Sequence, residues 1–282
     1  MDRPKRLSFC AEQARRFDRD RFVCALFAPA DRREDLYALY AFNHELAKVR
    51  ETVSEPQLGR MRLQWWRESL GACSNGRPPA HPVAQALAGA IGRHGLDLAQ
   101  FERMVAARWR DLEEWTPPDL EALAAHAEES AAPPTLLALR VLEADTVPAR
   151  AAARHVGIAW GLTGLLRAAA HDAARGRVAF PADLLAAAGL TADEVRARPR
   201  PGGLVRIAGQ IAARAGAHLA EARTVAADLP AAARPALLPA VLADAYLARL
   251  RRAGHDPWHR SFADGRPAGR TRLLWRVLRG GY

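Results

Sequence analysis

The sequence predicts an all-α protein, and three observations point to that class. Runs of Val, Ile, Thr or aromatic residues with a period of two are nearly absent, so few strands are expected. Apolar residues instead recur at steps of three and four, the period of an amphipathic helix. Ala and Leu are abundant in these stretches while Gly and Pro are sparse, which favours helices. Because no internal repeat is visible, we expect one all-α domain over residues 1–282.

The first informative helix is predicted over residues 31–52. Its inward residues fall at steps of three and four and therefore share one face. These residues are Leu36, Leu39, Tyr40, Asn43, Leu46, Ala47 and Arg50. The helix stops before Ser54, which we predict to be the N-cap of the next helix, with Gln57 completing a capping box.

The next helix is expected to end near Gly71 and carries two adjacent tryptophans, Trp65 and Trp66. Adjacent residues cannot share a helix face, so one ring is expected in the core and the other against a neighbour or loop. Turn-forming clusters divide the chain at 74–82, 116–118, 133–134, 199–203 and 255–269.

The second informative helix is predicted over residues 148–174. A stripe along it contains three small residues, Gly161, Gly164 and Ala168, followed by His171 and Arg175. Such a stripe either lets a second helix approach closely or leaves room for a cavity. The helix is expected to break at residues 175–177 (Arg-Gly-Arg).

The charge of the chain is basic but says little about its partners. The 282 residues include 41 Lys and Arg against 31 Asp and Glu, a formal net charge of +10. Lys5 and Lys48 are the only lysines, and this preference for arginine, together with abundant alanine, is typical of a GC-rich genome. Since no nucleic-acid motif accompanies the charge, we expect no nucleic-acid partner, and an RNA-binding helical module remains a third alternative.

The sequence predicts a cytoplasmic location. Its first residues lead into polar helical sequence without a secretory apolar region, and no apolar run reaches about 18 residues. The most apolar stretch, 229–250, is interrupted by Arg234, Pro235 and Pro239, and fits a helical core better than a membrane surface. Three cysteines without C-x-x-C spacing make a disulfide framework unexpected: Cys10, Cys24 and Cys73.

Three ordered stretches carry a resemblance. Residues 40–42 (Tyr-Ala-Phe), 161–167 (Gly-Leu-Thr-Gly-Leu-Leu-Arg) and 176–181 (Gly-Arg-Val-Ala-Phe-Pro) resemble the squalene/phytoene synthase family. The resemblance covers about residues 8–278 and implies an isoprenoid-synthase fold with a central cavity. It also implies two Asp-x-x-x-Asp motifs on facing helices. Carboxylates at that spacing share one helix face, and two such faces can hold Mg²⁺ against a diphosphate leaving group.

This sequence departs from the family pattern at the first motif. The expected pattern there is Tyr-Ala-Phe-Cys-Arg-x-x-Asp-Asp-x-x-Asp. The residues found after the aromatic stretch are Asn43 for Cys, His44 for Arg, Ala47 and Lys48 for the Asp pair, and Glu51 for the last Asp. A motif moved by one turn to Glu51 and Glu55 is the alternative, although the predicted capping box places Glu55 in the next helix.

The second motif departs in the same direction. The expected Gln-Leu-Thr-Asn-Ile-Leu-Arg-Asp-x-x-x-Asp has Gly161 for Gln, Gly164 for Asn, Ala168 for the first Asp, and retains Arg167 and Asp172. Three acidic positions are therefore lost across the two motifs. If Mg²⁺ were still bound, Glu51 and Asp172 would be its ligands, so we expect no cofactor and assign no catalytic residue.

The departures themselves resemble a subgroup. Residues 42–49, 53–55, 61–66, 161–168 with His171, and 177–181 are similar to the complex I assembly factor 6 group. Membership implies support for early assembly of the respiratory NADH dehydrogenase at or near the inner membrane, not terpene synthesis. The implied partners are complex I subunits or assembly intermediates. An isoprenoid or other lipid in the prenyl cavity is a further expected ligand. The basic surface charge, not the resemblance, favours contact with an anionic membrane on the cytoplasmic side.

Several residues keep two interpretations. The candidate cavity residues are Tyr40, Asn43, His44, Gly161, Gly164 and Arg167. His44 fits either the cavity or an ordinary helix histidine. Arg167 fits either an ion pair with Asp172, which we favour, or an anion site. The functional alternatives are a binding protein without prenyltransferase activity and an active Mg²⁺-dependent prenyltransferase.

Two further sets of charged or histidine residues also have two interpretations. Asp18, Asp20 and Arg21 fit a salt-bridged helix start, which we favour, or a cavity lid. His255 and His259 are four residues apart, but Pro257 lies between them, so a loop packed by Trp258 is expected instead of a metal pair.

Overall fold

The computed structural model describes residues 6–53, 55–113, 115–197, 203–263, 269–279 and 281–282. Within these ranges the chain is helical and has no strand, so the all-α prediction is confirmed. The chain divides into two compact units that interleave in sequence. The first unit contains residues 1–113, 133–150 and 230–236, and the second contains residues 114–132, 151–229 and 237–282. The expectation of a single domain stays a prediction.

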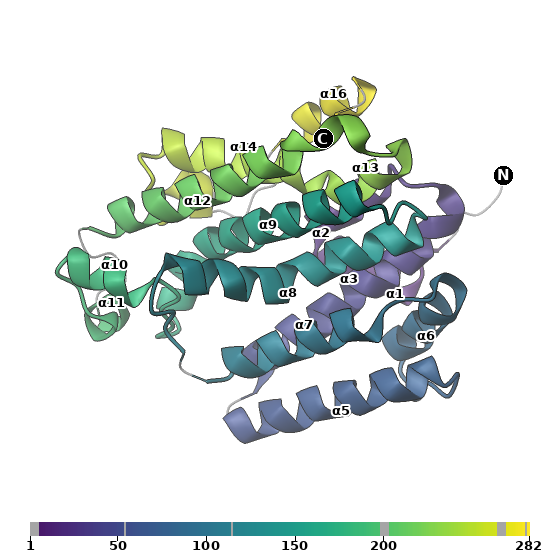
Figure 1. Ribbon diagram of the computed structural model, residues 1–282. Coiled ribbons are helices and arrows are strands. Elements are labelled where there is room, and N and C mark those ends of the chain that lie inside the picture. The colour runs from purple at the N-terminus through teal and green to yellow at the C-terminus, as the bar shows by residue number, and fades with distance from the viewer. Residues whose placement is uncertain (1–5, 54, 114, 198–202, 264–268, 280) are drawn as a thin grey trace. The chain divides into compact units, whose positions relative to one another are not determined.

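The helices of the first unit lie mainly in the N-terminal third of the chain. They are α1 (Phe9–Phe17), α2 (Arg19–Ala25), η1 (Ala30–Arg32), α3 (Arg33–Ala47), α4 (Val49–Thr52), α5 (Pro56–Ser74), α6 (Pro82–His94) and α7 (Leu98–Asp111), with η3 (Ala231–Ala233) and most of α13 (Arg234–Leu237). Figure 1 draws α5 along α6 and α7, and α5 contacts both.

Helix α3 is the centre of this unit. All its residues from Asp35 to Phe42 are buried, and α1, α2, α6 and α7 all contact it. The Phe42 ring meets Trp66 of α5 and Phe101 of α7 edge-on, at centroid distances of 5.2 and 5.5 Å. The strongly apolar run after Asp35 therefore buries the N-terminal half of the motif helix on several sides.

Two long helices contribute to both units. Helix α8 runs Leu120–Val141 and α9 runs Val147–Ala173. Pro133 and Pro134 lie inside α8, so the turn expected there is wrong, although the boundary between the two units falls at this pair. A proline removes one helical donor and disfavours the turn before it, yet packing on both sides of the pair keeps the helix continuous. The buried neighbours Ala132 and Thr135 flank the pair.

The second unit contains most of α8 and α9 and the C-terminal helices. These are α10 (Ala182–Ala187), α11 (Ala192–Ala197), α12 (Leu204–Thr224), η2 (Ala226–Asp228), α14 (Pro239–Arg252), α15 (Arg260–Ala263) and α16 (Arg270–Leu278). Helix α14 contacts α12, α15 and α16. Its buried residues Val241, Leu242 and Tyr246 confirm that the apolar stretch 229–250 includes a core helix.

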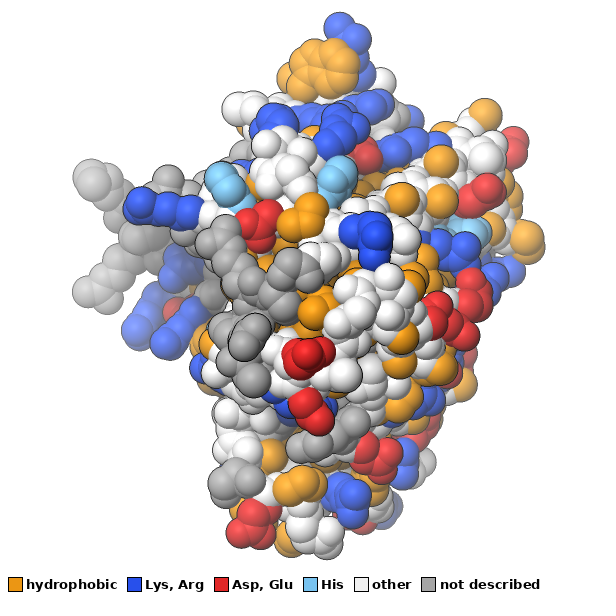
Figure 2. All heavy atoms as spheres, turned by 90° about the vertical axis from the view of Figure 1, so that its left-hand side faces the viewer, with side chains coloured by type: hydrophobic (Ala, Val, Ile, Leu, Met, Phe, Trp, Pro, Cys, Tyr) orange, Lys and Arg blue, Asp and Glu red, His pale blue; other side chains and the backbone are white. Residues whose placement is uncertain are grey.

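Charge is spread over the surface in both signs. On the face drawn in Figure 2, Lys and Arg side chains gather most densely toward the top of the view. No helix within the described ranges is both long and apolar enough to cross a bilayer.

Candidate functional site

The first motif occupies the end of α3 and the whole of α4. The expected helix over residues 31–52 is present but ends as α3 at Ala47 and resumes as α4 at Val49, with Lys48 at the C-cap between them. Tyr40 is fully buried, and burial raises its pKa well above the ordinary value, so it stays a neutral phenol. Asn43 and Ala47 are half-buried on the same helix.

Lys48 is neutralised within its own turn. Its Nζ lies 2.5 Å from Oε1 of Glu45, whose side chain is 8 % exposed. The cation that replaces a metal-binding acid thus pairs with a buried carboxylate three residues earlier. This pair removes Glu45 as a free ligand and leaves a neutral turn where the family pattern has acids.

His44 packs against an aromatic ring. Its imidazole stacks on Phe17 of α1 at a centroid distance of 4.1 Å. Burial, with a smaller contribution from the Lys48 cation, lowers the pKa of His44. These contacts favour the interpretation of an ordinary packed histidine that is neutral at pH 7.

Glu51 lies in α4 and is exposed. The alternative motif with Glu55 is wrong, because Val53 and Glu55 have extended backbone and Glu55 is the N-cap of α5. The two carboxylates therefore do not share a helix face. The predicted N-cap, Ser54, lies outside the described residues. The N-cap of α5 is Glu55 and the helix begins at Pro56, so the predicted position of the N-cap is wrong. Proline at the first helical position fixes the helix start without the expected side-chain cap.

The second motif occupies α9, which matches its predicted span. The small-residue stripe has two environments. A Cβ added to Gly161 would lie 3.0 Å from the Cβ of Ala127 and 3.1 Å from that of Ala131, so α8 approaches closely there. A Cβ added to Gly164, one turn later, meets nothing within 4 Å. The stripe therefore allows close helix packing at Gly161, one of the two alternatives, while Gly164 faces open space and the cavity alternative stays a prediction.

Asp172 has a different partner from the one expected. Its Oδ1 accepts from Nε and Nη2 of Arg177 at 2.9 and 2.5 Å. Arg167 and Asp172 are five positions apart on the helix, so their side chains point about 140° apart and the expected ion pair between them is wrong. Gly176, with φ of 72°, instead turns the chain after the helix, and the backbone N–H of Arg177 donates to the carbonyl of Asp172.

Arg167 lies on an aromatic surface. Its guanidinium carbon is 3.9 Å from the ring centroid of Tyr246 and 6.0 Å from that of Trp160. A cation over two ring faces is stabilised by their quadrupoles. Ala168, the next residue, is half-buried. His171 is exposed, and its Nδ1 lies 2.9 Å from Nη1 of Arg175.

The two sets of predicted site residues belong to different units. Those of the first motif are brought together on α3 and α4, and those of the second on α9. The cavity expected between them stays a prediction.

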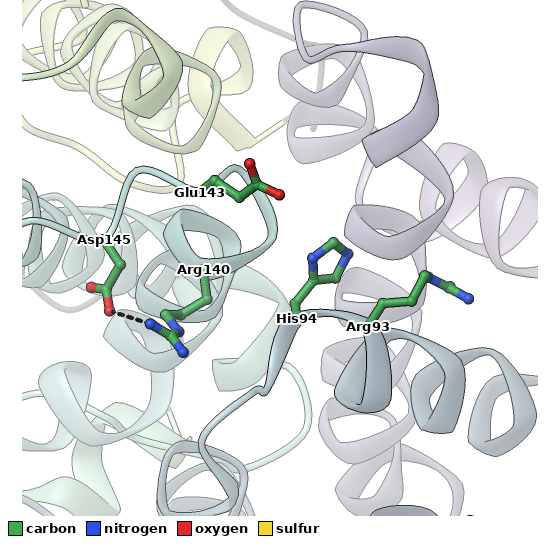
Figure 3. Close-up of a pocket in the computed structure, with 5 residues that line it drawn as sticks. All are labelled: Arg93, His94, Arg140, Glu143 and Asp145. Atoms are coloured by element: carbon green, nitrogen blue, oxygen red, sulfur yellow. Dashed lines mark hydrogen bonds and ion pairs between the residues drawn. The ribbon is translucent and has the colours of Figure 1, made fainter.

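A pocket of about 340 Å³ lies within the first unit (Figure 3). None of the predicted site residues lines it. Its charges are already paired, since Asp145 lies 3.4 Å from Arg140, and Glu143 lies 2.5 Å from Arg32. The pocket is therefore a surface ion-pair cluster and gives no preference for a ligand of one charge. Its lining residues are Arg93, His94, Arg140, Glu143 and Asp145.

Sequence reasoning missed two histidine contacts. Nδ1 of His155 on α9 lies 2.9 Å from Nδ1 of His218 on α12, and burial lowers the pKa of both. Nε2 of His94 donates to the carboxylate of Asp35 at 2.7 Å, and both side chains are buried. Partners about 60 residues apart leave no local pattern, whereas the i, i+3 spacing of Glu45 and Lys48 could have been found.

The smaller expectations are resolved by local geometry. Trp66 is buried and Trp65 is 40 % exposed beside His81, as expected of adjacent tryptophans. Asp18 is the N-cap of α2 and pairs with Arg21 at 3.0 Å, which confirms the salt-bridged helix start.

The histidines around Pro257 and the cysteines complete these outcomes. His255 lies in a turn and His259 in a bend, and Trp258 packs near Phe180, so the loop interpretation is confirmed. The three cysteines are buried free thiols, and burial raises the pKa of Cys10 to about 11.

Comparison with known proteins decides the family. The squalene/phytoene synthase family matches residues 14–277. The chain belongs to this family. It is 33 % identical over 253 residues to the rat (Rattus norvegicus) protein named NADH dehydrogenase (ubiquinone) complex I, assembly factor 6, covering 90 % of this chain and 76 % of that protein.

Solved structures agree with this assignment. Squalene synthase HpnC from Alicyclobacillus acidocaldarius superimposes with a TM-score of 0.77 at 26 % identity, covering 88 % of this chain and 94 % of that one. A dehydrosqualene synthase crystallised with a ligand gives a TM-score of 0.79 at 18 % identity over 96 % of this chain and 94 % of that one. These neighbours confirm the predicted isoprenoid-synthase fold.

The residues present do not fit the Mg²⁺ that the family pattern implies. Magnesium takes oxygen ligands, chiefly carboxylates, in its site. Here Glu51 is the exposed acid of the first motif, Lys48 stands in place of an acid and pairs with Glu45, and Asp172 is held by Arg177. Within the described ranges, no cluster of three or more acidic, histidine or cysteine side chains is placed to hold a metal.

Proposed function

We propose that this protein is an assembly factor for the respiratory NADH dehydrogenase, complex I, built on a squalene/phytoene synthase fold that no longer transfers prenyl groups. The observation that carries the proposal is the state of the two motifs. Three acidic positions hold Ala47, Lys48 and Ala168, and the acid retained on α9 is tied to Arg177. The similarity to assembly factor 6 over 90 % of the chain supports the same role.

In this proposal the protein acts by binding. Its partners are complex I subunits or assembly intermediates, met at the cytoplasmic face of the membrane that carries the enzyme. The protein associates peripherally with that membrane. An isoprenoid or another lipid is a second ligand, and the open space beside Gly164 supports room for one on α9.

The competing function is an active Mg²⁺-dependent prenyltransferase. It is supported by the retained Arg167, Glu51 and Asp172. However, Arg167 lies over Tyr246, and Asp172 is engaged by Arg177. A diphosphate leaving group would therefore meet one exposed acid and no organised carboxylate pair, which disfavours this alternative.

A deletion and rescue experiment tests the proposal. Removing the chain from its host is expected to lower NADH-driven respiration in isolated membranes and to deplete complex I on native gels. Succinate-driven respiration, which bypasses complex I, is the control and should be unchanged.

The rescue variants separate assembly from catalysis. The double variant Glu51→Ala, Asp172→Ala should restore NADH-driven respiration as well as the unaltered chain does, because no metal chemistry is needed. Unchanged complex I after deletion would contradict the assembly role. Turnover of farnesyl diphosphate that disappears in the double variant would establish the prenyltransferase instead.

A further inference from the structure

The C-terminal helix α16 presents an apolar strip to solvent. The strip consists of Leu274, Trp275 and Leu278, which are 55, 48 and 86 % exposed. Leu273 lies on the opposite side of the helix and is 1 % exposed. The helix is thus anchored by one side, while three large apolar side chains remain in water. Exposed apolar patches of this kind mark interaction surfaces.

Contacts within the second unit hold α16 in this orientation. Gly269, with φ of 75°, is the N-cap of the helix, and a Cβ there would lie 2.7 Å from the Cβ of Ala245 on α14. After the helix, the hydroxyl of Tyr282 donates to the buried carbonyl of Ala222 on α12 at 2.6 Å. The helix is therefore fixed at both ends, and Figure 1 draws it next to α14.

Arginines flank the apolar strip. Residues 269–279 contain four arginines and no acid. The guanidinium carbons of Arg279 and Arg276 lie 4.0 and 6.0 Å from the ring centroid of Trp275, and Arg272 is exposed. We refer to Arg272, Arg276 and Arg279 as the arginine flank. At the top of Figure 2, at the height of α16 in Figure 1, hydrophobic side chains lie among basic ones.

We propose that α16 is a membrane-docking helix that lies in the headgroup region of an anionic bilayer. The apolar strip enters the boundary between headgroups and acyl chains, and the arginine flank binds lipid phosphates. An amphipathic helix with tryptophan and leucine on one side and arginine beside them has the composition of an interfacial helix. Tryptophan is favoured at this depth because its ring is amphipathic.

The exposed position of the strip favours a bilayer over an acidic protein groove. The strip stands on the outer, convex side of a single helix, and a bilayer can cover it without a shaped partner. Each arginine near an anionic surface contributes about 1 kcal/mol, which corresponds to about fivefold in partitioning. This inference sharpens the peripheral location in the proposed function and rests on that location, not on the assembly role.

Vesicle co-sedimentation of the full chain tests the inference. The probes are phosphatidylcholine vesicles with and without phosphatidylglycerol. The unaltered chain is expected to sediment with the anionic vesicles and to remain soluble with the neutral ones. The strip variant Leu274→Ser, Leu278→Ser should bind more than about tenfold more weakly, since it removes two apolar anchors. Arg272→Gln should weaken binding about fivefold.

A matched control removes an exposed apolar residue elsewhere. Val147 at the start of α9 is 71 % exposed, and Val147→Ser should bind vesicles as the unaltered chain does. Thermal melting followed by circular dichroism checks that each variant is folded. Equal binding of the strip variant and the unaltered chain would overturn the inference. Strip-dependent retention on an acidic polypeptide resin without vesicle binding would also overturn it, in favour of a protein surface.

The respiration assay separates this inference from the assembly role. If the chain fails to bind vesicles but restores NADH-driven respiration, the docking helix is wrong and the assembly role stands. If vesicle binding is strip-dependent but deletion leaves complex I unchanged, the assembly role is wrong and the docking helix stands.

Discussion

Helices α3 and α9 each carry one degenerate motif, and they have replaced their acidic residues in different ways. At the end of α3 a lysine stands in place of an acid, and its charge is cancelled by the buried Glu45. On α9 the replacements are small, and the retained Asp172 is bound by Arg177 from the following turn. The first motif has changed its charge, while the second has kept an acid but gained space at Gly164.

In the proposed function, the two motifs depart from a metal site by two independent routes. Restoring an acid on α9 would still leave a lysine on α3, and removing Lys48 would still leave Asp172 engaged. The retained carboxylates are therefore poor evidence of retained catalysis. Ion pairs inside each motif also give these residues a structural role that stability measurements can detect.

The largest expected effect concerns the packing of α9. Gly157→Ala should destabilise the protein by about 3 kcal/mol, because its Cβ would fall 2.8 Å from the Cβ of Ala132 and closer still to its backbone. Gly164→Ala should instead raise the free energy of unfolding by up to about 1 kcal/mol, because the added Cβ meets open space and a glycine is removed from the helix interior. Urea unfolding of both variants measures the difference in stability. Equal changes in the free energy of unfolding would contradict close packing at Gly157 and open space at Gly164.

The next effect concerns the first motif. Lys48→Met should lower the free energy of unfolding by about 2 kcal/mol, because the buried carboxylate of Glu45 loses its ion pair. Lys48→Arg keeps the charge and serves as the matched control. If Lys48→Met were as stable as the unaltered chain, the pair would be incidental, and the proposed change of role at α3 would fail.

A smaller effect is expected at the second motif. Asp172→Asn should cost about 1 kcal/mol or less, because its pair with Arg177 is partly exposed. Glu51→Ala, at an exposed position, should change stability by no more than about 0.5 kcal/mol. A larger loss for Asp172→Asn than for Lys48→Met would reverse the comparison between the motifs.

The smallest effect is a pH dependence of the first motif. Burial lowers the pKa of His44 in the folded state, so the unfolded chain binds a proton more readily. Stability should therefore fall as pH decreases from about 7 through the ordinary histidine range near 6.5. His44→Gln should reduce that fall. Urea unfolding at pH 8 gives the effect of the substitution itself, and identical pH slopes in the two proteins would contradict the burial of the imidazole.

Much of the fold could be predicted from the sequence. The periodic apolar pattern predicts α9 to within a residue at each end, and one tryptophan of the adjacent pair is buried while the other is exposed, as predicted. Local signals failed where packing overrode them. Helix α8 continues through Pro133 and Pro134, and the N-cap of α5 is Glu55 instead of Ser54. Such outcomes depend on neighbouring helices, which a local pattern does not contain.

The candidate site was predictable in its losses but not in its contacts. The missing acids at positions 47, 48 and 168 are visible in the sequence, and so is the family pattern that they break. The ion-pair partner of Asp172 could not be predicted, because it depends on how the chain turns at Gly176. The stacking of His44 on Phe17 and of Arg167 on Tyr246 also depends on tertiary placement.

The central claim is that the two motifs no longer form a Mg²⁺-dependent prenyl diphosphate site. Calorimetric titration of the purified chain with Mg²⁺ and a non-hydrolysable prenyl diphosphate analogue tests this claim most directly. We predict that Mg²⁺ will not bind and will not alter binding of the analogue. Binding of the two ligands that depends on each other would contradict the claim and return the protein to the active synthases of its family.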